Sequence, residues 1–367
     1  MKFLETFSKK FLSGFLGQSP NRCFASLGSL RKPQTAPLTF IFLVLEKFLK
    51  IFKKLFSKSF LNRVKGQRPL RKDFKMYIAD KWKDYELLDA DSGKRLERWG
   101  KYSLVRPDPQ VIWKGCASDK LWKKADAKYT RSKSGGGAWD DNSKMPEKWQ
   151  IEYQSLGLKF VVRPTGFKHT GIFPEQAVNW EWSYDLIKNS GRKIKLLNLF
   201  AYTGGATVAA AAAGASVCHV DASRGMVEQA KENAALSGLA DAPIRYIVDD
   251  CRKFVEREIR RGNKYDAIIM DPPSYGRGPS GELWKLEDNI YEFVQLCSNL
   301  ISDKPLFVLV NSYTTGLSAS TMGCVLSLAV KSRFGGHVDA DEVGLPISAS
   351  GVNLPCGAAA RWVATKD

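Results

Sequence analysis

The sequence predicts an α/β fold in which a doubly wound, mostly parallel sheet follows a small β-rich domain. Two patterns predict it. From residue 195 onward, short apolar runs alternate with helical stretches, which is typical of parallel strands joined by right-handed crossovers. Residues 76–165 instead show short β-like stretches separated by turns. We therefore divide the chain into an N-terminal extension (1–75), a β-rich domain (76–165) and an α/β domain (166–367).

The composition is that of a folded globular protein, since 44% of the 367 residues are hydrophobic and 26% are charged. These values exclude a chain that is wholly disordered or embedded in a membrane. The net charge of +18 is uneven: residues 1–75 hold 17 Lys and Arg against 3 Asp and Glu, and residues 166–367 hold 21 against 22. The β-rich domain, with 18 against 13, fits either a surface for a polyanion or a solvated basic face.

The N-terminal extension fits three interpretations. Its apolar run at 38–45 is far shorter than the ~20 residues of a membrane-spanning helix, so we expect no stable membrane insertion. Residues 46–61 place apolar and basic residues at the spacing of an interfacial amphipathic helix. The extension is a targeting presequence, a membrane-surface anchor, or a disordered or non-native segment ahead of a start at Met76. Targeting would make the protein organellar; otherwise we expect a cytoplasmic location.

The β-rich domain is expected to contain several short strands, joined by turns and by a glycine-rich loop at 132–138. Its six tryptophans lie among many Lys and Arg, so they either stack on nucleic-acid bases or fill a small core. The expected strands are Tyr85–Leu88, Leu96–Leu104, Val111–Trp113 and Leu158–Arg163.

In the α/β domain, the expected strands and helices alternate, and a glycine follows each helix. The expected strands are Leu196–Phe200, Ser216–Val220, Ile244–Val248, Tyr265–Met270 and Leu306–Asn311. The expected helices are Ala206–Ala213, Arg224–Leu236, capped by Ser223, and Arg252–Arg261. In such sheets, ligands bind beyond the carboxyl ends of the strands. The residues that follow the strands are therefore the candidates for a site.

Metal and disulfide chemistry are not expected. The seven cysteines and three histidines are scattered, with no C-x-x-C pair. Zinc sites and disulfide frameworks both need ligands at short, repeated intervals. The cysteine pattern indicates a reducing compartment and no bound metal.

The first strand of the α/β domain ends in Asn198-Leu-Phe-Ala-Tyr-Thr-Gly-Gly. Gly204 and Gly205 allow a sharp turn and a close approach of the backbone to a ligand. The G-x-G-x-x-G pattern that cradles a pyrophosphate is absent, which disfavours a nicotinamide or flavin dinucleotide.

Acidic residues follow the second and third strands. Asp221 stands where a carboxylate can accept both hydroxyls of a ribose, and Asp250 stands where an acceptor could hold an adenine amino group. Either residue alone could be a helix cap. Together they indicate a nucleoside pocket without a phosphate site.

The fourth strand leads into Asp271-Pro-Pro-Ser-Tyr-Gly276. The prolines hold the segment extended and donate no N–H, so it presents a carboxylate and carbonyl oxygens. Such acceptors could hold an amine with its lone pair facing an electrophile, and Tyr275 could stack on a flat substrate.

These residues together resemble the class I S-adenosylmethionine-dependent methyltransferases, over about residues 76–367. The resemblance implies a seven-stranded Rossmann-like sheet and S-adenosylmethionine (SAM) as cofactor. It places the methionine part against Gly204 and Gly205, the ribose at Asp221 and the adenine amino group at Asp250. The cofactor-binding residues that it implies are Tyr202, Thr203, Gly204, Gly205, Asp221, Asp250 and Gln176.

Within that family, the stretches 198–205 and 168–176 look like the bacterial large-subunit ribosomal RNA methyltransferase subgroup, in which the second stretch caps the cofactor. Members that methylate C5 of cytosine use a cysteine after the fifth strand. Here that place reads Asn311-Ser-Tyr-Thr-Thr-Gly316, without a thiol. The departure favours direct transfer to an exocyclic amine.

The sequence therefore predicts an enzyme that methylates a base of ribosomal or other structured RNA. As catalytic residues we expect Asp271 and Pro272, which would orient the amine through a carboxylate and a carbonyl oxygen, and Tyr275, which would stack on the base. One alternative is a methyltransferase for a small molecule or a protein side chain, which the near-neutral α/β domain favours. Another is a non-catalytic protein that binds RNA or SAM.

Overall fold

A computed structural model describes residues 76–365, except 133–135, 142–144, 167, 278–282 and 315. Our interpretations of residues 1–75 fall outside the described residues. In the described part, no helix combines the length and the apolar character that crossing a membrane requires.

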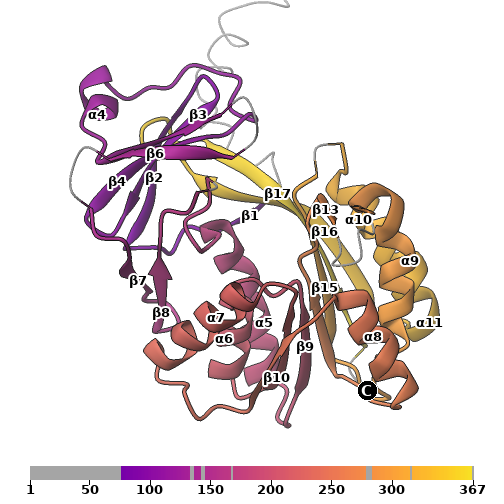
Figure 1. Cartoon of the computed structure of the whole chain (residues 1–367). Helices are drawn as coiled ribbons and strands as arrows, with labels where there is room; N and C mark the ends of the chain where they lie inside the picture. Colours follow the sequence, from indigo (N-terminus) through magenta and orange to yellow (C-terminus); the bar gives the residue numbers. More distant parts are fainter. Residues whose placement is uncertain are drawn as a thin grey trace, which may run out of the picture. The chain divides into compact units, whose positions relative to one another are not determined.

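An eight-stranded sheet lies at the centre of the described chain, in the order β1-β16-β17-β15-β12-β9-β10-β11 (Figure 1). All neighbouring strands are parallel except those that flank β17. This confirms the doubly wound, mostly parallel sheet, and β1 adds an eighth strand at its edge. The strands are β1 (Met76–Ile78), β9 (Lys195–Leu199), β10 (Ser216–Asp221), β11 (Ile244–Val248), β12 (Ala267–Met270), β15 (Phe307–Ser312), β16 (His337–Pro346) and β17 (Asn353–Val363).

Helices cover both faces of this sheet, so its central strands are buried on both sides and read as nearly continuous apolar runs (Figure 1). One face carries α5 (Ala177–Lys188), α6 (Gly205–Ala212) and α7 (Arg224–Leu236). The other carries α8 (Cys251–Arg260), α9 (Leu286–Ser298), α10 (Ala319–Leu326), the π-helical η2 (Ser327–Lys331) and α11 (Ser332–Phe334). Every strand and helix predicted in this domain is present, with ends within two residues of the predicted ones.

A five-stranded sheet and a separate strand pair make up the rest of the described chain. The sheet contains β2 (Tyr85–Asp91), β3 (Lys94–Trp99), β4 (Tyr102–Pro107), β5 (Ala127–Arg131) and β6 (Gly137–Asp141), and the pair contains β7 (Trp149–Tyr153) and β8 (Leu158–Val162). A short helix, α4 (Asp119–Lys123), precedes β5.

Two predicted strands of this region are wrong. The stretch Leu96–Leu104 is not one strand, because Gly100, at φ 64°, turns the chain between β3 and β4. Val111–Trp113 forms no strand, because Asp108 closes a turn there: its carbonyl accepts the Val111 N–H, and its carboxylate accepts the Gln110 N–H.

The tryptophans of this region are buried or half-buried, which supports the core interpretation. Trp99 is completely buried, and none of the six is among the exposed side chains. Four indole N–H groups donate to the protein itself: Trp82 to the Pro174 carbonyl, Trp122 to Asp89, Trp139 to the Thr165 carbonyl and Trp149 to the Trp99 carbonyl.

The five-stranded sheet is tied to the central sheet by backbone hydrogen bonds. Ser348 and Ala349, in the turn between β16 and β17, donate to the carbonyls of Leu87 and Leu88 on β2, at 2.9 and 3.0 Å. Arg106 on β4 also donates to the Lys168 carbonyl at 3.1 Å. These contacts link the five-stranded sheet to the turn between β16 and β17 and to the first residue of the 168–176 stretch.

Candidate active site

The strand register brings Asp221 and Asp271 to one edge of the sheet. Val220 on β10 and Met270 on β12 both pair with Leu199 on the central strand β9, from its two sides. All three strands are parallel, so Asp221, the last residue of β10, and Asp271, the first residue after β12, stand at the same level. The two acidic residues therefore flank the loop that starts at Phe200.

That loop holds an unusual backbone. Phe200 and Tyr202 lie in the left-handed region, at φ 55° and 49°, and Gly204 follows at φ 82°. Non-glycine residues there are strained, and such strain is found at ligand sites. The Asp221 carboxylate stabilises the loop, because its Oδ2 accepts the Tyr202 N–H at 2.8 Å and its Oδ1 accepts the Ser223 N–H at 2.8 Å.

Helix packing around the loop requires both of its glycines. A Cβ atom on Gly204 would lie 2.8 Å from the Cβ of Ala230 on α7. A Cβ on Gly205 would lie 2.6 Å from Cζ2 of Trp180 on α5. The small residues thus let two helices approach the turn after β9.

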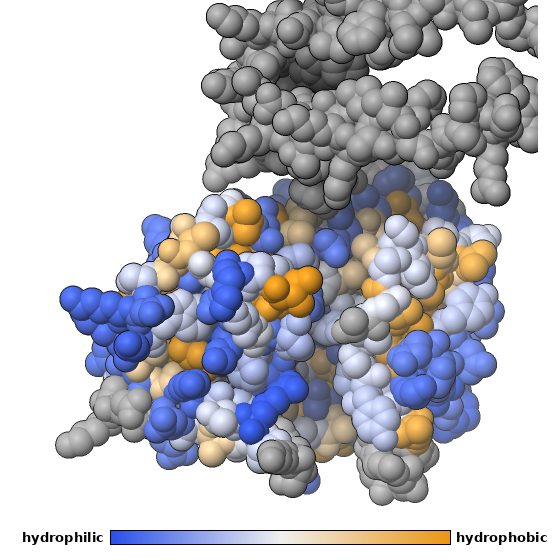
Figure 2. Space-filling view, turned by 90° about the horizontal axis from the view of Figure 1, so that it is seen from above, coloured by the Kyte–Doolittle hydropathy of each residue, from blue (hydrophilic) through white to orange (hydrophobic). Residues whose placement is uncertain are grey.

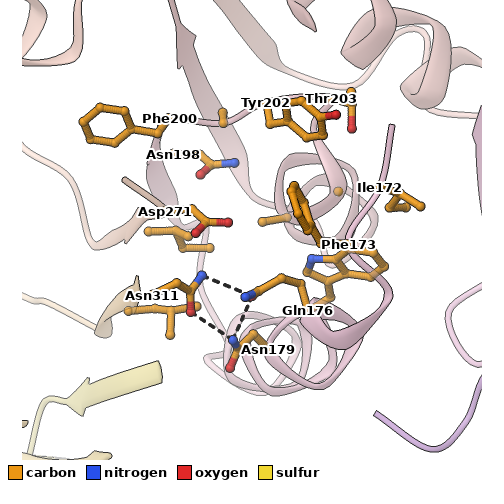
Figure 3. A pocket seen from close by; sticks show the side chains of 16 residues that line it. Ile172, Phe173, Gln176, Asn179, Asn198, Phe200, Tyr202, Thr203, Asp271 and Asn311 are labelled. Atoms are coloured by element: carbon orange, nitrogen blue, oxygen red, sulfur yellow. Dashed lines mark hydrogen bonds between the residues drawn. The ribbon is translucent and has the colours of Figure 1, made fainter. Parts of the chain in front are cut away.

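A pocket opens between this loop, η1 (Pro174–Gln176), α5 and the carboxyl ends of β9, β12 and β15 (Figure 3). Aromatic rings and buried amides dominate its walls. Its lining is Ile172, Phe173, Gln176, Asn179, Trp180, Asn198, Phe200, Ala201, Tyr202, Thr203, Gly205, Ala206, Ile269, Asp271, Leu309 and Asn311.

Five predicted site residues line this pocket: Gln176, Tyr202, Thr203, Gly205 and Asp271. Gly204, Asp221 and Asp250 lie at the same sheet edge without lining it. Asp250 caps α8, and its carboxylate accepts the Lys253 N–H at 2.9 Å. Burial raises the pKa of Asp221, although the hydrogen bonds from Ser223 and Tyr202 oppose the increase.

Asp271 presents the least satisfied polar atom of the pocket wall. Figure 3 shows its carboxylate directed into the pocket, and its Oδ1 atom is buried without a hydrogen-bond partner. Burial, together with the negative charge of Glu175, raises the pKa of Asp271 to about 7. This side chain can therefore gain or lose a proton close to neutral pH.

The segment after Asp271 is held rigidly. Pro272 is buried, the Pro273 carbonyl accepts the indole N–H of Trp284 at 2.7 Å, and the Ser274 carbonyl accepts the Leu286 N–H at 3.0 Å. Tyr275 lies on β13 (Tyr275–Arg277), which pairs with β14 (Leu283–Lys285); it is 56% exposed and does not line the pocket. Its stacking on a base stays a prediction.

Among the buried amides of the pocket, sequence reasoning assigned Gln176 to the cofactor but gave no role to Asn179, Asn198 and Asn311. The Gln176 Oε1 atom accepts from Asn179 at 2.8 Å and from Asn311 at 3.1 Å, which joins η1, α5 and β15 (Figure 3). The Gln176 amide also donates to the Tyr313 hydroxyl at 2.7 Å. A signal for them exists, since Asn198 and Asn311 interrupt otherwise apolar strands near their carboxyl ends.

No thiol takes part in the pocket: of the cysteines that the structure describes, none lines it. Cys356 is buried, and burial raises the pKa of its thiol well above the usual range. A buried neutral thiol is a poor nucleophile. Within the described residues, no group of His, Cys, Asp and Glu is arranged to hold a metal ion.

The pocket thus combines aromatic and amide walls with one unpartnered carboxylate oxygen, that of Asp271, while Asp221 supports the loop that forms one of its walls.

Comparisons with known proteins point to the same chemistry. Residues 128–316 match the family described as S-adenosylmethionine-dependent methyltransferase. A solved SAM-dependent methyltransferase from Agrobacterium tumefaciens is 38% identical, with a TM-score of 0.74, and the match covers 78% of this chain and 93% of that one. SMU.776, a methyltransferase solved in complex with S-adenosylhomocysteine (SAH), shares the fold at 19% identity and a TM-score of 0.60. That match covers 90% of this chain and 83% of that one.

Among curated proteins, the ribosomal RNA large subunit methyltransferase K/L of Shewanella frigidimarina is 28% identical over 277 residues. That match covers 70% of this chain and 38% of the relative, so the chain spans well under half of that protein's length. The protein of the same name from Pseudoalteromonas atlantica is 40% identical over 126 residues, which cover 34% of this chain and 17% of that one. With its parallel sheet, its pocket at the carboxyl edge and a family match over half of its length, the chain belongs to the S-adenosylmethionine-dependent methyltransferases.

Proposed function

We propose that this enzyme methylates a base of ribosomal or other structured RNA, with an exocyclic amine as the acceptor. The observation that carries the proposal is the Asp271 carboxylate, which is directed into the pocket from the end of β12 and whose Oδ1 has no hydrogen-bond partner. SAM, when bound, supplies an electrophilic methyl group on a sulfonium. The names of the Shewanella and Pseudoalteromonas relatives support RNA as the acceptor.

Residues of the loop after β9 are assigned to the cofactor. Tyr202, Thr203 and Gly205 line the pocket, and Gln176 closes it from η1 through its bonds to Asn179 and Asn311. We assign the ribose to Asp221 and the adenine amino group to Asp250, which follow neighbouring strands. Each carboxylate already accepts backbone N–H groups, which orient it while lone pairs remain for a ligand.

Asp271 and the carbonyl of Pro272 are assigned to the target amine. The Asp271 carboxylate accepts an N–H, so the nitrogen lone pair faces the cofactor end of the pocket, and it takes the proton that nitrogen loses on methylation. A pKa of about 7 suits this task, because the group is substantially ionised at neutral pH yet basic enough to accept a proton. Tyr275 is assigned to stacking on the base from the β13–β14 hairpin.

The surface of the β-rich domain supports an RNA substrate. Figure 2 shows hydrophobic residues scattered among hydrophilic ones on the visible face, without one broad hydrophobic area. Exposed lysines lie on and beside α4, including Lys120, Lys123 and Lys124. Cations of this kind can neutralise phosphates. We place the reaction in the cytoplasm, because cysteines stay in the thiol form there and ribosomal RNA is present.

A comparison of methylated nucleosides in total RNA, from cells with and without the gene, tests the proposal. We expect one base methylated on an exocyclic nitrogen to disappear and to return when the purified enzyme and SAM are added. Loss of a ring-methylated base instead would keep RNA as the substrate and overturn the amine assignment. An unchanged RNA profile would favour a small-molecule or protein acceptor. SAM binding without release of S-adenosylhomocysteine, with any cell fraction, would indicate a non-catalytic protein.

A further inference from the structure

Asn311 lies beside Asp271 on the wall of the pocket. Met270 on β12 and Val310 on β15 form a register pair, and Asp271 and Asn311 are the residues that follow them. Neighbouring strands lie about 4.8 Å apart, and both side chains line the pocket (Figure 3). An amide and a carboxylate that are neighbours on one wall can contact two adjacent groups of a single flat ligand.

A buried arginine determines which way round this amide lies. Arg361 on β17 is buried against the rings of Tyr77 and Trp182, whose centroids lie 3.7 and 5.0 Å from its guanidinium carbon. Burial lowers the pKa of Arg361 to about 10, so the side chain is still a cation at neutral pH. An arginine has N–H donors and no acceptor, so any amide atom that accepts from it must be an oxygen.

This constraint passes through Asn179 to the pocket. The Nε and Nη2 atoms of Arg361 both donate to Oδ1 of Asn179, at 3.0 and 2.5 Å. The Asn179 Nδ2 atom then donates to Oε1 of Gln176 at 2.8 Å and to Oδ1 of Asn311 at 3.1 Å (Figure 3). Since Oδ1 of Asn311 accepts there, Nδ2 is the atom that donates to Gln176, at 3.1 Å. The orientation of all three amides therefore follows from the arginine.

Asn311 keeps one N–H for a ligand. An asparagine amide has two N–H donors. One of them donates to Gln176, and no residue that the structure describes accepts the other. Asp271 offers the opposite polarity, because its Oδ1 atom is buried without a donor. The pocket wall thus presents a donor next to an acceptor.

Bases with an exocyclic amine carry the complementary pair of groups. In adenine, cytosine and guanine, the carbon that bears the amine is also bonded to an unprotonated ring nitrogen, which is an acceptor. Proteins recognise unpaired RNA bases through such edges. An amine N–H can therefore meet Asp271 while the ring nitrogen accepts from Asn311. Two contacts in the plane of the base fix its rotation, which one contact cannot do.

We propose that Asn311 determines specificity for the target base, because its Nδ2 donates to the ring nitrogen beside the amine that Asp271 holds. Arg361 is a positioning residue: through Asn179 it keeps Nδ2 of Asn311, and not Oδ1, at that place. The assignment rests on the proposed function and extends it from an amine to an amine with a neighbouring ring acceptor. A base without that acceptor leaves the Asn311 N–H unpaired, which slows its methylation.

The test measures kcat/KM on two synthetic RNAs with the target nucleotide that the comparison of methylated nucleosides identifies. In the second RNA, a C–H group replaces the ring nitrogen beside the amine. The full-length wild type should methylate the second RNA roughly 10- to 100-fold more slowly than the first. In Asn311→Ala the two RNAs should differ by less than about threefold. Intrinsic differences between the two amines affect both enzymes alike, so the comparison isolates the contact.

Three further variants separate this role from a structural one. Asn233→Ala is the matched control, because Asn233 is completely buried but bonds only to the backbones of Val161 and Thr203. A structural defect slows both RNAs equally, so Asn233→Ala should retain the wild-type ratio of the two rates. Arg361→Lys, which keeps a cation with donors only, should retain the ratio within about twofold. Arg361→Met should lower it toward the ratio of Asn311→Ala.

A wild type that methylates both RNAs at the same rate would overturn the assignment, even if Asn311→Ala does not fold. Equal ratios in the wild type and Asn311→Ala would overturn it too, since another group would then contact the ring nitrogen. An unchanged ratio in Arg361→Met would remove the role of Arg361. If the wild type does not methylate an amine of the unmodified RNA, the proposed function fails, and the assignment of Asn311 fails with it.

Discussion

Asp221 and Asp271 stand on either side of Phe200 because Val220 and Met270 pair with the same residue, Leu199. Neighbouring strands lie about 4.8 Å apart, so the two acidic residues are about 10 Å apart across the central strand. The register of three parallel strands therefore sets the spacing of these two carboxylates at the sheet edge. In the proposed function, this spacing separates the residue assigned to the ribose from the residue assigned to the target amine.

Replacement of Asp271 by Asn should abolish methyl transfer and leave the dissociation constant of SAM within a few fold. The amide keeps the shape of the side chain but cannot accept the proton that nitrogen loses. Equilibrium binding of SAM and release of S-adenosylhomocysteine, measured on one preparation, check both parts. Loss of cofactor binding would instead assign Asp271 to the cofactor pocket.

The rate should depend on pH through Asp271. Its pKa is about 7, so kcat/KM should rise with pH, with a midpoint near 7, and then reach a plateau as the carboxylate ionises. A profile measured from pH 5 to 9 at constant ionic strength checks this. A rate that does not change between pH 6 and 8 would show that the proton of the amine leaves by another route.

The raised pKa of Asp271 also predicts how the stability of the fold depends on pH. In the folded protein the Asp271 carboxyl keeps its proton up to about pH 7, whereas in the unfolded chain the same carboxyl is deprotonated above about pH 4. The stabilisation from the raised pKa is therefore complete below about pH 4 and is lost as the pH rises through about 7. Asp271→Asn removes this loss, so it should exceed the wild type in unfolding free energy by roughly 2–4 kcal/mol at pH 8, with a smaller difference at pH 5. Urea denaturation at the two pH values checks it.

Asp221→Asn should weaken SAM binding at least tenfold and lower the melting temperature. The Asp221 carboxylate accepts the N–H groups of Tyr202 and Ser223, and an amide retains only one oxygen for them. Asp250→Asn is the matched comparison, because Asn caps a helix about as well as Asp. Isothermal titration with SAM separates the two effects. A weaker affinity in Asp250→Asn at unchanged melting temperature would support the adenine assignment.

The α/β core was predictable because its signals are local and repeated. Buried parallel strands read as apolar runs, and each predicted helix ends before a glycine. The strands β16 and β17 were not predicted. The edge strand β1 was not predicted either, because its partner is distant in sequence: Met76 pairs with Glu342. In the β-rich region, the strand prediction was wrong at Gly100 and Asp108, because a single residue at each place decides whether the chain continues as a strand or turns.

At the site, the sequence identified residues that follow strands and missed those inside them. Asp221 and Asp271 were found because strand ends meet at one edge. Asn179, on a helix that was not predicted, joins Gln176 and Asn311 only in three dimensions. Glu175 lies in the 168–176 stretch that the sequence singled out, but the sequence gave it no role of its own, since only its burial and its unpartnered oxygen distinguish it.

Gly205→Ala should destabilise the protein and weaken SAM binding. Its new Cβ would lie 2.6 Å from the ring of Trp180, which is 3% exposed and packed against Phe160, so the ring cannot move aside without disturbing the core. Overpacking of this kind costs about 1–3 kcal/mol, more than the ~1 kcal/mol that an alanine gains in a helix. Gly225→Ala, in the first turn of α7 with no atom within 4 Å of its new Cβ, should be neutral or slightly stabilising. Thermal unfolding and SAM titration of both variants check the prediction. Equal stability of the two would show that Trp180 yields, and that small residues at this turn serve the ligand rather than the packing of α5.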